Sequence, residues 1–424
     1  MASLALPARN PARFVALDPH DPRASADGIA GGPGASALAM HEDGREVAIK
    51  ERSGAAPGRG LRVVIAGGGT GGHLFPGIAL AEEIQREGGE VLFVGTDRGI
   101  EARVVPEQGY ALAKIDAIGI KGRGVFGLVR GLARLPGAWW QSRAILKKFR
   151  PDVVVGVGGY ASGPLIATAA MMGIPGGIME QNSVPGITNR ILARVVKRIF
   201  CTFEDPQGFF PAKKCVLTGN PIRRQLLASL QGDEDAAAAT PPRLFVFGGS
   251  QGARAINRTF LAALPALLAA IPELEIWHQT GKADFDEVTA GYAALGLEAP
   301  KVRVDAFIKG MAEPYRWCDL VLCRAGATSL AELTAVGRPA VLVPFPHATD
   351  NHQEHNARSL VDAGAATLMR ESEWSADSLA EHLRGLLGDR GRLTTMSRSM
   401  LAAARPDAAG HIYSELVTLV GDRR

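Results

Sequence analysis

The chain has 424 residues, enough for two or three domains, and its hydrophobic and charged fractions of 46% and 21% are ordinary for a globular protein. A formal charge of +4 is too small to indicate a nucleic-acid-binding protein, and the four cysteines lack metal-ligand spacing, which favours small buried thiols in a reducing compartment. No stretch approaches the roughly 18 apolar residues of a membrane-spanning helix, so we expect a soluble or peripherally attached protein.

Residues 1–60 differ in composition from everything that follows. They are rich in Ala, Gly, Pro, Asp and Arg, with no sustained apolar period and no signal-peptide core. Such a segment cannot bury enough apolar surface to order itself. We therefore expect a disordered tail, or an over-long start with Met40 as the internal alternative; a targeting arm is the weaker hypothesis.

From residue 61 onward, short apolar runs alternate with longer amphipathic segments. Strands are predicted at 62–66, 90–95, 152–157, 176–179, 198–202 and 215–218, with helices between them that include 76–86 and 187–196. The pattern restarts with strands at 244–247, 275–279, 303–306, 319–323 and 340–343, and with helices that include 253–270 and 329–336. Most strands are continuous Val, Ile and Leu runs, which is typical of parallel strands covered on both faces.

This order predicts an α/β protein with two doubly wound, Rossmann-like domains facing each other across a cleft. The N-terminal domain spans 61–230, the Asp-, Ala- and Pro-rich linker 231–242, and the C-terminal domain 243–405. A last helix is predicted at 406–424, and it can pack back on the first domain. Ligands of such sheets bind beyond the carboxyl ends of the strands, so the cleft suits a protein that joins two ligands.

A glycine turn follows the first predicted strand. Gly67, Gly69 and Gly72 have the spacing G-x-G-x-x-G between a strand and a helix, and His73 comes next. Glycines let the backbone approach an anion, and the amides of the helix start point at it, so any phosphate or diphosphate fits. The alternative is a turn that only permits tight strand–helix packing.

Two more helix starts follow strands in the second domain. Ser250, in the glycine cluster 248–252, can donate to a phosphate oxygen or simply cap the helix. Gly326, Ala327 and Thr328 offer amides at the next start, and Glu332 one turn later can accept hydrogen bonds from a ribose diol. An ordinary helix start with an acidic first turn is the alternative.

Polar side chains crowd the loop and helix start at 347–356. The spacing H-E-x-x-H is missing, and Gln and Asn are poor metal ligands, so a metal site is not favoured. Amides and carboxylates with several donors and acceptors match a polyhydroxylated sugar. A solvated, capped helix start is the alternative.

The segment 117–151 contains no acidic residue and mixes basic with large apolar side chains. Basic residues are attracted to anionic lipid headgroups, and Phe and Trp can enter the interface. We therefore predict contact with an anionic membrane surface through Phe126, Arg130, Arg134, Trp139 and Trp140. The alternative is a helix packed on the sheet with a solvated basic face.

Seven motifs together, in this order, resemble the MurG-type glycosyltransferases of family 28. They are GGGTGGHLFPG at 67–77, GVGGYASGP at 156–164, EQNSVPG at 180–186, TGNPIR at 218–223, GGSQGARAIN at 248–257, CRAGATSLAE at 323–332 and DNHQEHNA at 350–357. The resemblance covers about 61–420 and implies a GT-B fold, UDP-GlcNAc as donor, and undecaprenyl-diphosphoryl-MurNAc-pentapeptide (lipid I) as acceptor. It further implies a peripheral enzyme on the cytoplasmic face of the bacterial inner membrane, with partners among cell-wall synthesis and division proteins left open.

The resemblance also implies site residues. Thr70, Gly71 and Gly72 correspond to the loop at the donor sugar and acceptor diphosphate, and Asn182 to the asparagine of a loop facing the second domain. Arg223 and Ser250 correspond to groups that hold the UDP phosphates, and Ile308 to the residue whose backbone meets uracil. The segment around phosphate and ribose corresponds to Ala327, Thr328, Ser329, Leu330, Ala331 and Glu332. Gln353 corresponds to a sugar-hydroxyl contact; where this chain has His352–Gln353 the family often has two glutamines.

Moving a sugar onto a hydroxyl calls for a base, and His73 is our candidate because an imidazole titrates near neutrality. No D-x-D pair follows a strand, so we expect no obligatory metal and no cofactor, with helix N-termini, Ser250 and Arg223 stabilising the leaving UDP. Three alternatives stay open: a related UDP-sugar-dependent glycolipid synthase, a non-catalytic UDP-sugar sensor, and an NAD-dependent oxidoreductase with Asp97 as ribose partner.

Overall fold

The computed structural model describes residues 60–97, 99–117, 124–205, 207–230, 241–249 and 252–422, with only the backbone at 124–134 and 230. The predicted tail up to residue 59 and most of the predicted linker lie outside these ranges. No helix in the described part of the chain is long and apolar enough to span a bilayer.

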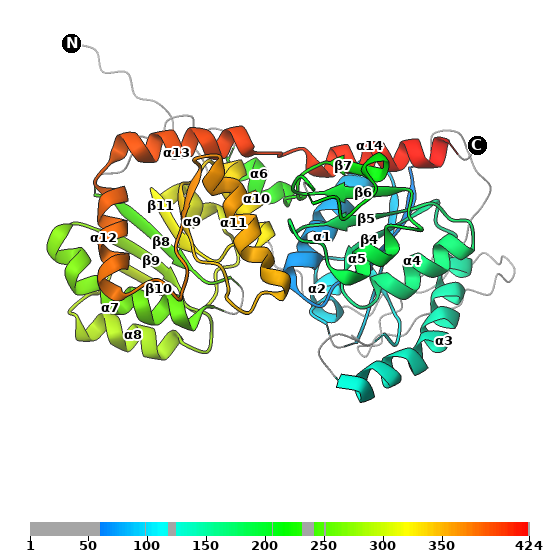
Figure 1. The fold of residues 1–424 in the computed structure, drawn as a ribbon, viewed down its shortest axis with the longest axis horizontal. Coiled ribbons are helices and arrows are strands. Elements are labelled where there is room, and N and C mark those ends of the chain that lie inside the picture. The colour runs from blue at the N-terminus through cyan, green and yellow to red at the C-terminus, as the bar shows by residue number, and fades with distance from the viewer. Residues whose placement is uncertain are drawn as a thin grey trace, which may run out of the picture. The chain divides into compact units, whose positions relative to one another are not determined.

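The first sheet is parallel throughout, and within the described residues its order is β3-β2-β1-β4-β5-β6-β7. Figure 1 shows its strands β4, β5, β6 and β7 side by side. Its strands are β1 (Arg62–Gly67), β2 (Glu90–Gly95), β3 (Ala111–Lys114), β4 (Val153–Gly158), β5 (Gly176–Glu180), β6 (Arg198–Cys201) and β7 (Cys215–Leu217). Its helices are α1 (Gly71–Arg86), α2 (Glu101–Glu107), α3 (Gly124–Phe149), α4 (Ser162–Met171) and α5 (Ile187–Leu192), and a short 3₁₀ turn spans Ala212–Lys214.

The second sheet repeats this plan in the order β10-β9-β8-β11-β12-β13, again all parallel. Its strands are β8 (Arg243–Phe247), β9 (Glu275–Gln279), β10 (Val302–Asp305), β11 (Leu320–Cys323), β12 (Ala340–Leu342) and β13 (Ala366–Leu368). Its helices are α6 (Arg224–Leu230), α7 (Arg254–Ala270), α8 (Phe285–Ala294), α9 (Ala312–Trp317), α10 (Ala327–Val336), α11 (His352–Asp362), α12 (Ala376–Leu387) and α13 (Arg390–Ala403).

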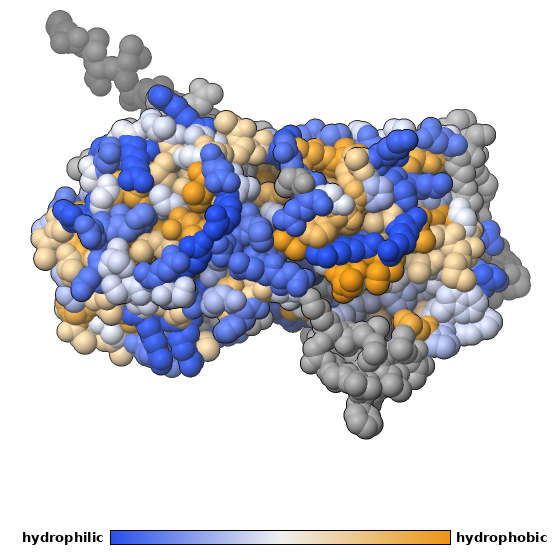
Figure 2. Space-filling view, viewed as in Figure 1, coloured by the Kyte–Doolittle hydropathy of each residue, from blue (hydrophilic) through white to orange (hydrophobic). Residues whose placement is uncertain are grey.

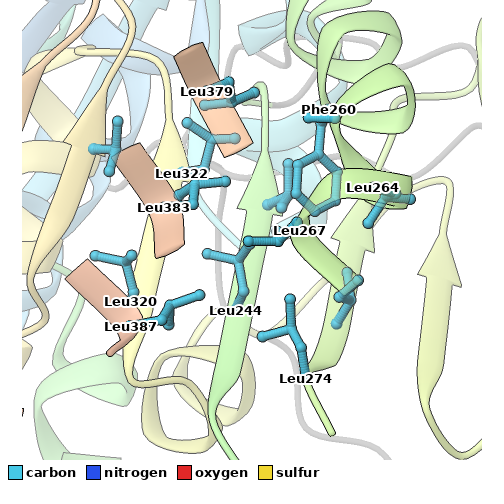
Figure 3. Packing of buried hydrophobic residues seen from close by; sticks show 14 of the residues in the cluster. Leu244, Phe260, Leu264, Leu267, Leu274, Leu320, Leu322, Leu379, Leu383 and Leu387 are labelled. Carbon is cyan, nitrogen blue, oxygen red and sulfur yellow. The ribbon is translucent and has the colours of Figure 1, made fainter. Parts of the chain in front are cut away.

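Alternate residues of β8 face two separate hydrophobic cores. Leu244 and Val246 pack with α7 and α12, as the leucines of these helices show in Figure 3, whereas Phe245 and Phe247 pack with α9, α10 and α11. Burial of this strand on both faces explains its unbroken apolar sequence. The prediction of two doubly wound, Rossmann-like domains is therefore confirmed.

The C-terminal helix α14 (Ala408–Gly421) packs against α1 of the first domain. Ile412, Leu416 and Leu419 are part of the first domain's core, and Glu415 pairs with Arg198 at 2.9 Å. The chain thus returns to its first domain after completing the second.

Four elements differ from the prediction. Strands β3 and β13 were not predicted, because each is a short edge strand with partly exposed side chains and no continuous apolar run. Helix α1 begins at Gly71 rather than at Pro76, and α5 ends at Leu192, before the β-branched pair Val195–Val196.

Candidate active site

The glycine turn after β1 meets the end of β4, where the order of the first sheet reverses. Helices after these two strands diverge, so the edge between them is open to a ligand. Gly158 at the end of β4 has a φ of +96°, and a Cβ atom there would lie 2.7 Å from His73 Nδ1. Glycine at this position therefore lets the imidazole pack directly on the strand end.

The half-buried imidazole of His73 has a defined partner: its Nδ1 lies 3.1 Å from Gln181 Oε1. Burial lowers the pKa of His73, the hydrogen bond with Gln181 partly offsets this, and the charge of His352 lowers it further. A hydrogen bond with the Val157 carbonyl raises the pKa of His73. A pKa below the usual value leaves the imidazole neutral near pH 7, the form that can accept a proton.

The buried carboxylate of Glu101 fixes the backbone of the glycine turn by a hydrogen bond. Glu101 at the start of α2 accepts hydrogen bonds from the Gly69 amide at 2.7 Å and from the amide and hydroxyl of Thr96 at 3.0 Å. Thr70 and Gly72 stay exposed and Gly71 half-buried at the start of α1. The three predicted residues are therefore accessible to solvent, and the turn that carries them is fixed by Glu101.

The glycine turn of the first domain is hydrogen-bonded to the second domain at a carbonyl that Pro76 leaves without its helical donor. Pro76 lies inside α1 and has no N–H to donate to the Gly72 carbonyl four residues earlier. The hydroxyl of Thr328 in α10 donates to this carbonyl instead, at a long 3.5 Å. The loop predicted at the sugar and the helix start predicted at the phosphate are thus neighbours.

Asn356 of α11 joins the domains through three hydrogen bonds to the loop after β5. Its Oδ1 accepts from the Ser183 amide at 2.8 Å and from the Ser183 hydroxyl at 3.0 Å. Its Nδ2 donates to Asn182 Oδ1 at 3.2 Å and to the Ala325 carbonyl at 3.4 Å. The predicted Asn182 is therefore held by Asn356, which is itself fully buried.

The loop that carries Asn182 is organised by Glu180. This carboxylate accepts from the amides of Asn182 and Gly186 and from the side chain of Asn189, at 2.8 to 3.2 Å. Burial raises the pKa of Glu180, and these hydrogen bonds act in the lowering direction. The glutamate of the motif at 180–186 therefore shapes the loop, and the residues after it face the second domain.

Glu332 lies in α10 with one oxygen already engaged: the buried Tyr315 hydroxyl donates to its Oε2 at 3.0 Å. Burial raises the pKa of Glu332, while the nearby Arg223 guanidinium and the Tyr315 hydroxyl oppose the shift. Arg223 in turn lies over the Phe75 ring of the first domain, 5.0 Å from its centroid. The predicted phosphate cation and the predicted ribose acceptor are therefore close in space.

The start of α11 has an unusual backbone: Asp350 and Asn351 are both left-handed, with φ of +52°. Such strain in non-glycine residues is concentrated at functional sites. The following Gln353 is half-buried, and its Oε1 accepts from the Phe345 amide at 3.0 Å, which fixes the side chain and leaves its NH₂ group as the donor. His352 bonds the Thr349 carbonyl at 2.8 Å through Nδ1.

The other predicted residues fall in three groups. Ala327 and Leu330 are buried, whereas Thr328, Ser329 and Ala331 are partly exposed on α10. Ile308 packs on the second domain's core beside Met311. Ser250 lies outside the described residues, although Gly249 beside it is described, with a φ of +91°.

Of the predicted membrane residues, Trp139 is partly buried on α3 and Trp140 is 64% exposed. The rings of the two tryptophans contact each other edge to face, with centroids 4.9 Å apart. Phe126, Arg130 and Arg134 belong to the part of α3 for which only the backbone is described. Asp97, the ribose partner of the oxidoreductase alternative, pairs with Lys114 at 2.8 Å on the surface.

Sequence reasoning missed Gln181, Glu101 and Tyr315, and it left Asn356 unassigned. Gln181 and Asn356 stand inside the quoted motifs, so their motifs could have pointed to them. Glu101 and Tyr315 carry no local signal, because their partners come from other strands and helices. Among the described residues no group of three or more His, Cys, Asp and Glu side chains is placed to hold a metal ion.

Comparisons with known proteins agree with this geometry. Residues 63–201 match the glycosyltransferase family 28 N-terminal domain, and residues 243–412 match the family 28 C-terminal domain. The chain is 50% identical over 360 residues to a protein of Geobacter sulfurreducens, covering 84% of this chain and 98% of that one. It is 49% identical over 362 residues to a protein of Myxococcus xanthus, covering 85% and 93%.

Both relatives are named UDP-N-acetylglucosamine–N-acetylmuramyl-(pentapeptide) pyrophosphoryl-undecaprenol N-acetylglucosamine transferase. The crystal structure of Acinetobacter baumannii MurG superposes with a TM-score of 0.68 at 33% identity, covering 84% of this chain and 99% of that one. The predicted GT-B fold is thereby confirmed, and the oxidoreductase alternative gains no support. The chain belongs to glycosyltransferase family 28.

Proposed function

We propose that this chain transfers N-acetylglucosamine from UDP-N-acetylglucosamine to the MurNAc hydroxyl of undecaprenyl-diphosphoryl-MurNAc-pentapeptide, giving lipid II for peptidoglycan synthesis. The names of relatives at about 50% identity support this activity. The observation that carries it is the joining of the two domains by Asn182, Ser183 and Asn356, beside His73 and Thr328. A reaction between two ligands requires that both are held close together in a fixed geometry, and contacting loops from two domains can hold them in this way.

In this proposal His73 takes the proton of the acceptor hydroxyl as the oxygen attacks the anomeric carbon from the face opposite UDP, which inverts that carbon. The imidazole is suited to the role because its lowered pKa keeps it neutral near pH 7. Gln353 and Asn182 offer amide groups to the sugar hydroxyls.

UDP leaves with negative charge on its β-phosphate, and this charge needs stabilisation. We infer that the amides of Ala327 and Thr328 at the start of α10 bind the phosphate, and that the N-terminus of α7 adds a favourable dipole field. Arg223 adds a full positive charge, and Ser250 a hydroxyl donor. Glu332 keeps Oε1 for the ribose hydroxyls, because Tyr315 occupies Oε2.

Transfer of radiolabelled GlcNAc onto a short-chain lipid I analogue tests the proposal. We expect labelled product with this acceptor and none with a diacylglycerol acceptor. Labelled product only with diacylglycerol would identify the glycolipid synthase instead. UDP-GlcNAc binding without transfer to either acceptor would identify a sensor.

The lipid-borne acceptor implies that the first domain contacts a membrane. Helix α4 contacts both α3 and α5. These three helices carry exposed apolar side chains, namely Trp140, Met171, Ile187 and Ile191. Arg194 is exposed beside them, and Figure 2 shows hydrophobic surface in the region of α5 crossed by hydrophilic side chains. Together with the predicted Phe126, Arg130 and Arg134, this combination suits an anionic lipid surface.

Replacing Ile187 and Ile191 by Ser tests this surface. We expect roughly tenfold weaker cosedimentation with anionic liposomes, because two side chains lose about 1 kcal/mol or more of partial burial in the interface. Phe307→Ser is the matched control, since Phe307 is similarly exposed but lies in the second domain. Unchanged binding of the double variant would refute the surface.

A further inference from the structure

Gln181 lies between His73 and the end of strand β4, and it is almost fully buried, with 2% of the residue exposed. Its Oε1 lies 3.1 Å from His73 Nδ1, and its Nε2 donates to the Val157 carbonyl at 3.1 Å. The residue follows β5 directly, so three neighbouring strands of the sheet contribute to this one arrangement: β1 through its turn, β4 and β5.

The orientation of the Gln181 amide follows from its second partner. The Val157 carbonyl can only accept a hydrogen bond, so the amide group that faces it must be the NH₂. The oxygen of Gln181 therefore faces His73. Since this oxygen cannot donate, Nδ1 of His73 must carry the hydrogen.

A neutral imidazole with hydrogen on Nδ1 has its lone pair on Nε2. We propose that Gln181 is a positioning residue that locks His73 in the Nδ1–H tautomer, so that Nε2 is the atom that accepts the proton of the acceptor hydroxyl. This inference rests on the proposed role of His73 as base. It assigns to Gln181 the orienting task that a carboxylate performs in Ser-His-Asp sites, here carried out by a neutral amide.

The choice of an amide has a chemical consequence. A carboxylate beside Nδ1 would favour the charged imidazolium, which cannot act as a base, whereas the uncharged amide orients the ring with less gain in proton affinity. His352 faces the ring from the second domain, and a positive charge on it would also disfavour the imidazolium of His73. The arrangement thus combines a fixed ring with a low tendency to hold a proton.

Ring-nitrogen NMR of the full chain with ¹⁵N-labelled histidine measures the tautomer directly. Spectra are recorded about two pH units above the pKa of free histidine, and His73 is identified by the signals missing in His73→Ala. The variants are Gln181→Met, which keeps the length of the side chain but removes donor and acceptor, and Gln181→Glu, which keeps an acceptor. Far-UV circular dichroism and UDP-GlcNAc binding report whether each variant is folded.

We expect the wild type to show Nδ1–H alone, Gln181→Met to show a mixture of tautomers, and Gln181→Glu to recover Nδ1–H. The kcat of GlcNAc transfer falls at least tenfold in Gln181→Met, but by less than the full 10²- to 10⁴-fold contribution of a general base, and the KM for UDP-GlcNAc is unchanged. Persistence of Nδ1–H alone in Gln181→Met, or a mixture in folded Gln181→Glu, overturns the inference. A mixture with unchanged kcat supports the role of Gln181 in fixing the ring but removes the base assignment of His73.

Discussion

Asn356 accepts two hydrogen bonds from Ser183, although 173 residues separate them in the chain and they belong to different domains. The acceptor is fully buried, and its amide also bonds Asn182 and Ala325. One side chain therefore couples the loop after β5 to helix α11 of the second domain. The site depends on this coupling, because its residues come from both domains.

Asn356→Ala should loosen the coupling. It leaves the Ser183 amide and hydroxyl without their acceptor, and each buried unsatisfied polar group costs about 1–3 kcal/mol. We expect a lower thermal midpoint by calorimetry and at least a tenfold lower kcat/KM for GlcNAc transfer. His355→Ala, an exposed change one residue earlier on α11, is the control and should alter neither. Normal activity of Asn356→Ala would show that the coupling is dispensable.

Tyr315→Phe tests the support of Glu332. Loss of the hydroxyl leaves a buried carboxylate oxygen without its donor, at a cost of about 1–3 kcal/mol. The side chain then turns or takes up a proton, so we expect a roughly tenfold higher KM for UDP-GlcNAc with little change in kcat. Binding of UDP by calorimetry measures the same loss without turnover.

Tyr292→Phe is the matched control for that experiment. Tyr292 is equally buried in the second domain, but its hydroxyl contacts His278 away from α10. Its removal should lower stability and leave the KM unchanged. Equal KM values for the two variants would argue against a role of Tyr315 in donor binding.

The fold was predictable from the sequence to a large extent, and the site much less so. Eleven strands were predicted within one residue of their ends, because parallel strands buried on both faces give unbroken apolar runs, as in β4 and β8. Edge strand β13 has no such run. The predicted start of α1 at Pro76 is five residues later than the observed start at Gly71, because proline is typical of a first helical turn. Nothing in the local sequence reveals that the Thr328 hydroxyl replaces the donor that this proline lacks.

Contacts within the site are long-range, which is why residue patterns indicate them poorly. His73 and Gln181 are 108 positions apart and meet only because β1, β4 and β5 are neighbours in the sheet. The glycine spacing correctly placed His73 next to a turn at a strand end. Its partner, its tautomer and its lowered pKa required the fold.

The buried His278 predicts a pH dependence of stability. Its ring bonds Tyr292 and Asn257, and burial lowers its pKa to about 3. The unfolded chain binds a proton at this residue below about pH 6.5, whereas the folded chain does not until about pH 3. This contribution to the free energy of unfolding is therefore complete above pH 6.5 and declines as the pH falls, by up to about 1.4 kcal/mol per pH unit.

Urea unfolding of the wild type and of His278→Gln at pH 7 and pH 5 isolates that contribution. The variant lacks the titrating ring, so its loss of stability between the two pH values should be smaller by about 1–2 kcal/mol. Equal losses in both proteins would mean that His278 can be protonated in the folded state.

Metal removal tests the predicted source of electrostatic stabilisation. If helix N-termini, Arg223 and Ser250 stabilise the leaving UDP, thorough chelation with EDTA should leave GlcNAc transfer within twofold of the untreated rate. The control is a Mg²⁺-dependent glycosyltransferase treated in parallel. Complete loss of activity that Mg²⁺ restores would show that a metal ion does this work.

The most direct test of the account is GlcNAc transfer from UDP-GlcNAc to a short-chain lipid I analogue by wild-type and His73→Ala chains, followed from pH 5 to pH 9 in roughly one-unit steps. We predict that wild-type kcat/KM falls only below about pH 6.5, because the folded pKa of His73 lies under its usual value. His73→Ala should lose 10²- to 10⁴-fold in kcat with UDP-GlcNAc binding intact. Near-normal turnover by His73→Ala with the same pH profile, or no transfer by the wild type, would contradict it.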